Sequence, residues 1–549
     1  MISNADIFSF PINPQYDKLV AYFSMEFAVD QALKTYSGGL GFLAGSHLRS
    51  AYELKQHLFG VGILWKYGYY DQGRNEEGLM KPYFITKDYS FLTDTGILFA
   101  IQIHNSPVFI KAYLLKSETF SSAPLFLLST DIPENDEISR TITHVLYDST
   151  ISTRIAQSIV LGIGGATLID KIGLNPKIYH MNEGHSLPLN FYLYSKFQSL
   201  AEVKKRVVFT THTPESAGNE EHSFELLKEM SFFYHLQIHE VKFILGLDGE
   251  NLNYTLAALK FANKANGVSK LHGIVANEMW QNYTGICPIY SITNAQNKTY
   301  WKDDILEKGF NSGDDRLIAD QKKNLKKLLF LTVADQCGKI FNPNVLTLIW
   351  ARRFAGYKRA DLLLQNWDRF LKLIENSKYP IQIIWAGKPY PEDHSSIQIF
   401  NEIIKKTLAF PNCAVLVGYE LALSSELKKG SDIWLNNPRM YREASGTSGM
   451  AAAMNGSINV SIPDGWVPEF AIDGQNSFVI QAAPENLSQE EKDNVETINL
   501  LDTLEQKVIP LYYENQLEWI KIMKKAAQDI FPKFDSGRMV EEYYHKLYS

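Results

Sequence analysis

The run "VLTLIWARRF" (Val345–Phe354) is a stretch of mostly apolar, partly β-branched residues that ends in two arginines. A strand buried on both faces of a parallel sheet has this composition, and polar residues follow at its carboxyl end. Six further runs have the same form and alternate with amphipathic helical segments; they cover 177–182, 206–213, 381–389, 414–418, 432–437 and 458–465. The sequence therefore predicts an α/β fold with ligands at the carboxyl ends of the strands.

The chain has 549 residues, which is too long for a single hydrophobic core, so we expect two large domains. We place the first domain at 1–300, with a β-rich insertion at 67–136, and the second at 341–510. A charged helical linker at 301–340 separates them. The closing helices at 511–549 are rich in aromatic residues and have the length to cross back onto the first domain.

Composition and charge exclude several classes of protein. The net charge of −7 disfavours a nucleic-acid partner, and three widely spaced cysteines provide neither a disulfide framework nor a metal motif. The N-terminal residues lack a basic segment followed by an apolar core, and three glycines interrupt the apolar stretch at 159–169. We therefore expect a cytoplasmic protein that neither enters a membrane nor binds nucleic acid.

Three glycines precede a helical pattern in "YSGGLGFLAGSHLRSA" (Tyr36–Ala51). Because they lack a Cβ atom, Gly38, Gly39 and Gly41 allow backbone N–H groups to approach an anion at the start of a helix. A tight turn, or close packing of a strand on a helix, explains the same glycines. The sequence alone leaves both interpretations open.

Two histidines lie in "IYHMNEGHSLPLNF" (Ile178–Phe191). His180 and His185 match no zinc motif, so we expect no metal here. Asn182 and Glu183 are interpreted as residues of a hydrogen-bonded turn that cap the following helix.

A third histidine, His212, follows a predicted strand in "VVFTTHTPESAGNE" (Val207–Glu220). A polar side chain at the carboxyl end of a parallel strand points toward the place where ligands bind. A hydrogen-bonded core histidine is the alternative.

Four cations lie within eight residues of "WARRFAGYKRADLLL" (Trp350–Leu364). They are Arg352, Arg353, Lys358 and Arg359, and they repel one another unless they share an anion. Arginine can grip a phosphate with two donors, and lysine acts as a point charge. A solvated basic patch is the alternative, but the position at the end of a strand favours an anion site.

The stretch "EASGTSGMAAAMNG" (Glu443–Gly456) places an acidic residue before a glycine-rich turn and a helix. The N–H groups at 446–449 would begin the helix and favour an anion, while Glu443 can accept hydrogen bonds from sugar hydroxyls. The sequence contains no readable carboxylate pair of the kind that a glycosidase needs.

Taken together, these motifs resemble the α-glucan (glycogen, starch, maltodextrin) phosphorylases, specifically their short bacterial and archaeal branch. The matching blocks occur in the family's order; they are "YSGGLGFLAGSHL", "NEGHS", "FTTHTPESAGNE", "NGVSKLHG", "ARRFAGYKR", "EASGTSGM" and "IPDGWVPEF". The resemblance implies a GT-B fold, in which two doubly wound Rossmann-like domains face a central cleft. It also implies that inorganic phosphate cleaves an α-1,4-glucan or maltodextrin to give glucose 1-phosphate with retention, by an enzyme that is often a homodimer.

The resemblance assigns the phosphate groups to particular residues. Arg353 and Lys358 would bind the substrate phosphate. Arg352, Thr447 and Ser448 would surround the phosphate of pyridoxal 5′-phosphate, which is the part of this cofactor that takes part in the family's reaction.

The sugar contacts are assigned in the same way. The glucosyl hydroxyls would be held by five residues, namely Glu443, Ser445, Gly446, His212 and Asn294. The backbone N–H groups of Gly38, Gly39 and Leu40 would reach the sugar and the phosphate. Catalysis is assigned to Arg353, Lys358, His212 and Glu443.

Two departures from the family pattern affect these expectations. The lysine that binds pyridoxal covalently would follow Met450, but residue 451 is alanine, so the cofactor is expected to bind only non-covalently, if it binds. Lys428 and Lys429 are expected to lie too far back, in another element. In "ITNAQNKTYW" (Ile292–Trp301) the family's Asn-Gly-Val-His is kept only at its first residue.

Three functions remain open on the sequence. The first is a phosphorylase with non-covalent or absent pyridoxal phosphate. The second is a cofactor-free GT-B glycosyltransferase with a nucleotide-sugar donor, although such enzymes carry a second glutamate eight residues after the first, and 443 + 8 is again Ala451. The third is an inactive glucan-binding homologue, against which the retained cations argue because they repel one another.

Overall fold

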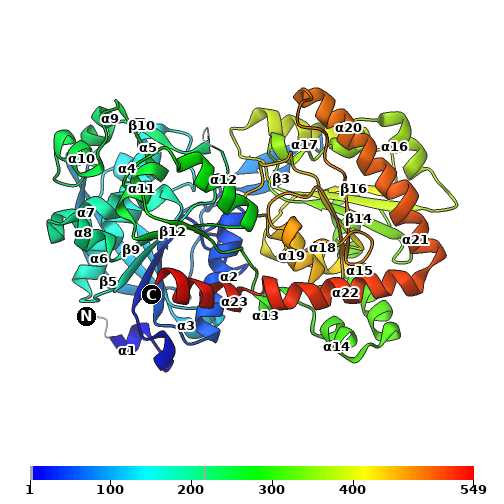
Figure 1. The fold of residues 1–549 in the computed structure, drawn as a ribbon, viewed down its shortest axis with the longest axis horizontal. Coiled ribbons are helices and arrows are strands. Elements are labelled where there is room, and N and C mark those ends of the chain that lie inside the picture. Colours follow the sequence, from blue (N-terminus) through cyan, green and yellow to red (C-terminus); the bar gives the residue numbers. More distant parts are fainter. Residues whose placement is uncertain (1–3, 216–217) are drawn as a thin grey trace. The chain divides into compact units, whose positions relative to one another are not determined.

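The computed structural model describes residues 4–215 and 218–549, and the chain divides into two compact units (Figure 1). The first unit contains the described residues up to Tyr70, together with Phe84–Thr293 and Ser536–Ser549. The second unit contains Asp71–Tyr83 and Asn294–Asp535. The chain leaves the first unit at Asp71 and returns to it at Phe84. It leaves again at Asn294 and returns finally at Ser536.

The first unit is built on a nine-stranded sheet with the order β13-β12-β9-β8-β1-β2-β7-β6-β5. All neighbours are parallel except β7-β6 and β6-β5, which are antiparallel. The strands are β1 Val20–Phe23, β2 Leu58–Ile63, β5 Thr93–Ile103, β6 Ser106–Leu115, β7 Leu125–Ser129, β8 Ile178–Asn182, β9 Val207–Thr210, β12 Lys264–Gly267 and β13 Ile289–Ser291. A separate antiparallel pair is formed by β10 Glu221–Ser223 and β11 Asn251–Asn253.

The helices of the first unit are α1 Asn4–Ile7, α2 Gly39–Glu53, α3 Ser117–Phe120, α4 Glu137–Thr141, α5 Ile151–Ile159, α6 Gly165–Lys171, α7 Pro188–Phe197, α8 Leu200–Lys204, α9 Phe224–Glu229, α10 Ile238–Leu245, α11 Tyr254–Phe261, α12 Lys270–Trp280 and α23 Ser536–Glu542. Helix α23, near the C-terminus, packs against α2 (Figure 1). The hydroxyls of Ser50 on α2 and Ser536 on α23 are hydrogen-bonded at 2.6 Å, which fixes the returning chain.

The second unit is built on a six-stranded parallel sheet with the order β16-β15-β14-β17-β18-β19. Its strands are β14 Leu346–Ala351, β15 Ile381–Ala386, β16 Cys413–Leu416, β17 Ile433–Asn436, β18 Ile458–Ser461 and β19 Ser477–Val479. The chain builds outward from β14 in one direction and then from β17 in the other, which is the doubly wound arrangement. The predicted α/β class, with two large and mostly parallel sheets, is confirmed.

The helices of the second unit are α13 Lys298–Trp301, α14 Asp304–Ser312, α15 Asp315–Cys337, α16 Trp367–Ile374, α17 His394–Thr407, α18 Leu421–Gly430, α19 Ser448–Ala453, α20 Gln489–Asp502, α21 Ile509–Glu514 and α22 Gln516–Phe534. The charged stretch at 301–340 forms α14 and α15 inside this unit, and α15 packs along α18. None of the helices in the described ranges combines the length and apolarity that crossing a membrane requires.

The core of the second unit explains why α19 is rich in alanine. Ala452 on α19 is fully buried in the same apolar cluster as Trp434 on β17 and Leu427 on α18. A larger side chain would overfill this space, because protein interiors are close-packed. Helix α19 therefore lies flat against both the sheet and α18.

A hairpin from the N-terminal part of the chain belongs to the second unit. Its strands, β3 (Asp71–Arg74) and β4 (Met80–Tyr83), lie within the stretch that we assigned to an insertion in the first domain. Gln72 is buried; its Nε2 donates to the Gly387 carbonyl at 2.8 Å, and its Oε1 accepts from the Gly418 N–H at 2.9 Å. These two bonds attach the hairpin to the ends of β15 and β16.

We predict that Gln72→Ala loosens this hairpin. The substitution leaves one buried backbone acceptor and one donor without their partner, and each costs about 1–3 kcal/mol. Urea unfolding should therefore show a free energy of unfolding lower by about 2 kcal/mol or more. Glu76→Ala, at an exposed position of the same hairpin, should leave that free energy unchanged. Equal effects of the two substitutions would contradict this role of Gln72.

Candidate functional site

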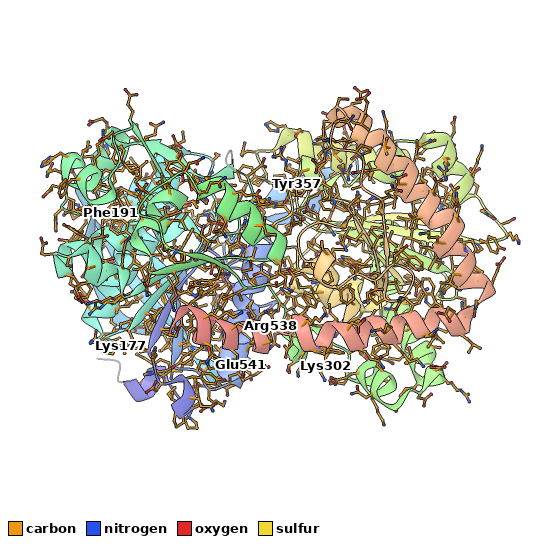
Figure 2. The ribbon with its side chains drawn as sticks, viewed as in Figure 1. Lys177, Phe191, Lys302, Tyr357, Arg538 and Glu541 are labelled. Carbon is orange, nitrogen blue, oxygen red and sulfur yellow. The ribbon has the colours of Figure 1, made fainter. Side chains whose placement is uncertain are left out.

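Polar residues gather where the winding of the second sheet reverses. This switch point lies between β14 and β17, and in doubly wound sheets ligands bind in the crevice that opens there. Arg352 directly follows β14, and its guanidinium donates to the Leu435 carbonyl at 3.1 Å and to Asn436 Oδ1 on β17. Tyr357, which is labelled in Figure 2, lies in the loop that follows β14. The structure therefore brings the cationic motif to the edge that the fold favours for a ligand.

Three of the cations surround one carboxylate, and we call Arg352, Arg353, Lys358 and Glu443 the Glu443 cluster. Lys358 Nζ lies 2.6 Å from Glu443 Oε2, and Arg352 Nη1 lies 3.8 Å from the same oxygen. Burial raises the pKa of Glu443, but Lys358, Arg352 and Arg353 outweigh this effect and hold it below its ordinary value. The shared anion that the sequence requires is thus Glu443 itself, which was expected only as a ligand for sugar hydroxyls.

The fourth cation of the motif is not part of this cluster. Arg359 is buried, donates to Asn437 O and Asp493 Oδ1 at 2.9 Å each, and pairs with Glu496 Oε2 at 2.6 Å. It therefore fixes helix α20 to the end of β17, and it leaves three cations at the Glu443 cluster.

The turn that carries Glu443 is held by a second carboxylate. Asp464, just after β18, accepts hydrogen bonds from the N–H groups of Arg442 at 3.1 Å and Glu443 at 2.9 Å. Burial raises the pKa of Asp464 to about 6. Gly446 follows with a φ of 73°, a left-handed conformation that glycine adopts without strain. Asp464 and Gly446 together set the position of the Glu443 carboxylate.

The residues assigned to a cofactor phosphate lie at the start of α19. Thr447 precedes the helix, no side chain caps it, and Trp434 Nε1 donates to Ser448 Oγ at 3.3 Å. Arg352 Nε is buried, and no hydrogen-bond partner for it lies in the described residues. Ala451 is fully buried further along α19.

Two assigned sugar contacts also belong to the second unit. Ser445 is buried beside Glu443 in sequence, and its hydroxyl donates to the Gly446 carbonyl at 3.3 Å. Asn294 is buried, and within the described ranges its Oδ1 accepts no hydrogen bond. An unused buried acceptor of this kind suits a ligand hydroxyl.

In the first unit the glycine-rich turn is bound to a carboxylate. Glu26 accepts hydrogen bonds from Ser37 N at 2.7 Å, Gly38 N at 3.1 Å and the Tyr147 hydroxyl at 2.7 Å. The Gly38 N–H, which we expected to face a ligand, is therefore already used. Gly39 and Leu40 begin α2, whose N-terminus has no side-chain cap, so their position at a helix start is as expected.

His212 belongs to a hydrogen-bonded chain at the switch point of the first sheet, between β1 and β8. Its Nε2 lies 2.7 Å from Asn182 Oδ1, and Asn182 Nδ2 donates to Ser24 Oγ at 3.1 Å. Burial, together with His272 and His185, lowers the pKa of His212 to about 3, so the ring is neutral. Because Asn182 Oδ1 only accepts, the proton is on Nε2, and Nδ1 keeps a lone pair that can accept from a hydroxyl.

Glu183 combines an unusual backbone conformation with a shifted pKa at this edge. It has a φ of 73°, in the left-handed region that non-glycine residues rarely adopt. Its carboxylate accepts from His212 N at 2.7 Å and caps the next turn through Gly184 N at 3.2 Å. Burial raises the pKa of Glu183 to about 7. Strain and a shifted pKa at the end of a strand are typical of functional sites.

His180 is a core residue. Its ring nitrogens lie 2.7 Å from the Tyr548 hydroxyl and 2.7 Å from Thr210 Oγ1, so the ring is fully hydrogen-bonded inside the first unit. In the ranges 4–215 and 218–549, no group of three His, Cys, Asp or Glu side chains is arranged to hold a metal ion.

Comparison with known proteins identifies the family. The chain is 33% identical to the maltodextrin phosphorylase of Thermococcus litoralis, over 98% of this chain and 71% of the relative. It is 30% identical to the glycogen phosphorylase of Aquifex aeolicus, over 97% of this chain and 86% of the relative.

The chain belongs to the glycogen and maltodextrin phosphorylase family. It is also 46% identical to the uncharacterized protein MJ1631 of Methanocaldococcus jannaschii, over 97% of this chain and the whole of the relative. No protein-family model matches the sequence. Membership places the chain among glycosyltransferase-type enzymes of carbohydrate metabolism, and the fold agrees with the GT-B phosphorylase type.

The sequence analysis did not recognise three carboxylates as parts of the candidate site of this phosphorylase homologue. Glu26 and Asp464 were not singled out, and Glu183 was interpreted only as a cap. Each lies one to three residues beyond a buried parallel strand, β1, β8 or β18. A carboxylate one to three residues after a predicted buried strand was the feature by which the sequence could have identified them.

The raised pKa of Glu183 predicts a pH-dependent stability. Below about pH 4.5 this carboxyl is protonated in both states, and between about 4.5 and 7 the folded chain binds the proton more tightly. Raising the pH through this window therefore lowers the free energy of unfolding, and the loss is complete above about pH 7. The glutamine of Glu183→Gln stays neutral at every pH. The free energy of unfolding of this variant, relative to that of the wild type, should therefore rise by up to about 3 kcal/mol from pH 4.5 to pH 8.

Urea unfolding at several pH values measures this difference. Glu221→Gln is the matched control, because Glu221 is exposed and its variant should follow the wild type at every pH. A Glu183→Gln curve parallel to that of the wild type would contradict the buried, raised-pKa state.

Proposed function

We propose that the chain is a retaining glucosyltransferase that cleaves the non-reducing end of an α-1,4-glucan with inorganic phosphate and yields glucose 1-phosphate. The Glu443 cluster carries this proposal. Three cations and one carboxylate leave two positive charges at the switch point of the second sheet. A phosphate dianion would neutralise these two positive charges, and the exposed side chain of Arg353 could contact it.

The transfer moves one glucosyl unit from the glycosidic oxygen to a phosphate oxygen. The C1–O bond of the glucan breaks, a new C1–O bond to phosphate forms, and the shortened glucan leaves with the proton of the hydrogen phosphate ion on its new hydroxyl. We assign phosphate binding to Arg353 and Lys358, whose charges stabilise the anion beside a positively charged sugar in the transition state.

Sugar binding is assigned to residues of each unit. In the second unit, Glu443, Ser445, Gly446 and Asn294 would bind glucosyl hydroxyls. In the first unit, His212 would accept a hydroxyl proton through Nδ1, and Gly39 and Leu40 would donate N–H groups. The N–H of Gly38 would have to exchange its bond with Glu26 before it could take part.

Pyridoxal 5′-phosphate fits the second unit through its phosphate group. The unused Arg352 Nε would donate to that phosphate, beside Thr447 and Ser448 at the start of α19. Position 451 offers a methyl group, so these contacts would be non-covalent. When bound, the cofactor supplies a second phosphate group next to the substrate phosphate.

The proposal predicts a cofactor-dependent release of phosphate. Glucose 1-phosphate and a maltodextrin primer are incubated with the protein, with and without pyridoxal phosphate, and inorganic phosphate is measured. We expect release only when the cofactor is present, since glucan extension from glucose 1-phosphate is the reverse of phosphorolysis. No release in either case would reject the proposed activity.

The same preparation separates the two other functions. A nucleotide-sugar donor would place its diphosphate on the same cations, so UDP-, ADP- and GDP-sugars are tested by thermal shift. A raised melting temperature with one of them, without phosphate release, would replace the phosphorylase proposal by a nucleotide-sugar transferase. Binding of maltodextrin with neither response would indicate an inactive glucan-binding homologue.

Arg353→Ala tests the phosphate assignment directly. Losing one charge-assisted hydrogen bond of about 1.5–3 kcal/mol should lower phosphate release by about ten- to a hundredfold. The control is Arg316→Ala, an exposed arginine of α15 that pairs only loosely with Asp320, at 3.8 Å, and it should leave the rate unchanged. Unchanged phosphate release by the Arg353→Ala variant would show that Arg353 does not bind the substrate phosphate.

A further inference from the structure

The Glu443 cluster is built from two loops of the second unit. Its cations lie in the β14 loop, residues 352–359, and its carboxylate ends the β17 loop, residues 437–443. Arg359 in the first loop has a φ of 51°, and Tyr441 in the second has a φ of 62°. Residues other than glycine rarely adopt such angles, and they keep them only where the surrounding structure holds them. The conformations of both loops therefore depend on groups that bind them from outside.

Hydrogen bonds join the two loops to each other. The Arg439 N–H donates to the carbonyl of Tyr357, which is labelled in Figure 2, at 2.8 Å. Asn437 Nδ2 donates to the Arg359 carbonyl at 2.7 Å, and Arg359 Nε donates back to the Asn437 carbonyl at 2.9 Å. A shift of one loop therefore displaces the other as well.

Asp493 on α20 binds both loops at once (Figure 1). Its Oδ1 accepts from Arg359 Nη1 at 2.9 Å and from Gln489 Nε2 at 3.0 Å. Its Oδ2 accepts from Arg439 Nη2 at 2.7 Å. Burial raises the pKa of Asp493, but Arg439 and Arg359 outweigh this effect and hold it below its ordinary value. The side chain is therefore a carboxylate, and it connects an arginine of the β14 loop to an arginine of the β17 loop.

A second carboxylate of α20 has a narrower role. Glu496 Oε2 lies 2.6 Å from Arg359 Nη1, and its Oε1 accepts from the Ala483 N–H at 3.0 Å. Ala483 lies outside both loops. Glu496 therefore balances the charge of Arg359, whereas Asp493 joins Arg359 to Arg439.

The spacing of the two loops determines which contacts the cluster can make. Lys358 Nζ in the β14 loop lies 2.6 Å from Glu443 Oε2 in the β17 loop. Charge-assisted hydrogen bonds of this kind are short, so they tolerate little displacement of either partner. A binding group that is misplaced by about 1 Å can cost about a hundredfold in function. Groups that fix the loops therefore act on the affinity of the cluster for an anion.

We propose that Asp493 is a positioning residue of the Glu443 cluster. Through Arg359 and Arg439 it holds the β14 and β17 loops at the spacing at which the cluster binds a phosphate group. Asp493 itself touches neither phosphate nor sugar. This inference deepens the proposed function and rests on the phosphate binding that the proposed function assigns to Arg353 and Lys358.

The binding of inorganic phosphate tests this role without any need for catalysis. Asp493→Asn keeps the size of the side chain and removes its charge. Calorimetry on the full chain measures the dissociation constants for inorganic phosphate and for maltodextrin. We expect phosphate to bind about ten- to a hundredfold more weakly to the variant. Maltodextrin affinity should be unchanged, because Asp464 holds the turn of Glu443 independently of α20.

Asp502→Asn is the matched control on the same helix. Asp502 forms an ion pair with Arg369 on α16, away from both loops, so this variant also loses a carboxylate that binds an arginine. It should bind inorganic phosphate as the wild type does. Equal losses of phosphate affinity in Asp493→Asn and Asp502→Asn would overturn the inference, since any weakening of α20 would then have the same effect.

Two further variants separate positioning from folding, which melting temperatures report. The Arg439 side chain is one-third exposed, and Asp493 keeps its bond to Arg359 in Arg439→Gln, so this variant should fold even if Asp493→Asn does not. Arg439→Gln cuts the contact of Asp493 with the β17 loop and should also weaken phosphate binding. Asp493→Glu restores the charge and should recover part of the lost affinity. A folded Arg439→Gln variant with wild-type affinity for phosphate would overturn the inference.

The outcomes for the positioning role and for the proposed function are distinguishable. Phosphate binding that Asp493→Asn weakens, without phosphate release from glucose 1-phosphate by the wild type, would retain the positioning role and reject phosphorylase activity. Phosphate release by the wild type, with unchanged phosphate affinity in folded Asp493→Asn, would retain the proposed function and reject the positioning role. A wild-type chain that binds no inorganic phosphate, with or without pyridoxal phosphate, would also overturn the inference.

Discussion

The ion pairs of Glu443 organise the carboxyl edge of the second sheet. Lys358 comes from the loop after β14, Arg352 from the end of β14, and Glu443 from the turn before α19. Without the carboxylate, two buried cations would face each other in a medium of low polarity, which is strongly destabilising. The loop, the strand end and the turn therefore take up their positions together, because each supplies a charge that the others require.

Seven strands of the two sheets were predictable because their physical signal is local. Each of the seven predicted runs is apolar over its length and ends in polar residues, and each forms a parallel strand. The hairpin of β3 and β4 was placed in the wrong context for the opposite reason. Its attachment depends on Gln72 and Gly387, which are 315 residues apart, and no pattern within the hairpin predicts that contact.

The motifs of the candidate site were recognisable in the sequence, but the hydrogen-bond and ion-pair partners of their residues were not. The motif that contains Arg352, Arg353 and Lys358 is recognisable, while the carboxylate that balances it lies in another motif. The Gly38 N–H appeared free because its partner, Glu26, lies in an unremarkable stretch after β1.

The cations of the Glu443 cluster bear on how the alanine at position 451 is interpreted. An apolar replacement of a buried ion pair is often neutral or even stabilising, so a protein that served only as a scaffold would gain little from Arg352 and Lys358. Their presence beside an exposed Arg353 supports the proposal that this edge binds an anion. Under the proposed function, Ala451 would alter only the way in which a cofactor is held, and the phosphate contacts assigned to the Glu443 cluster would not depend on it.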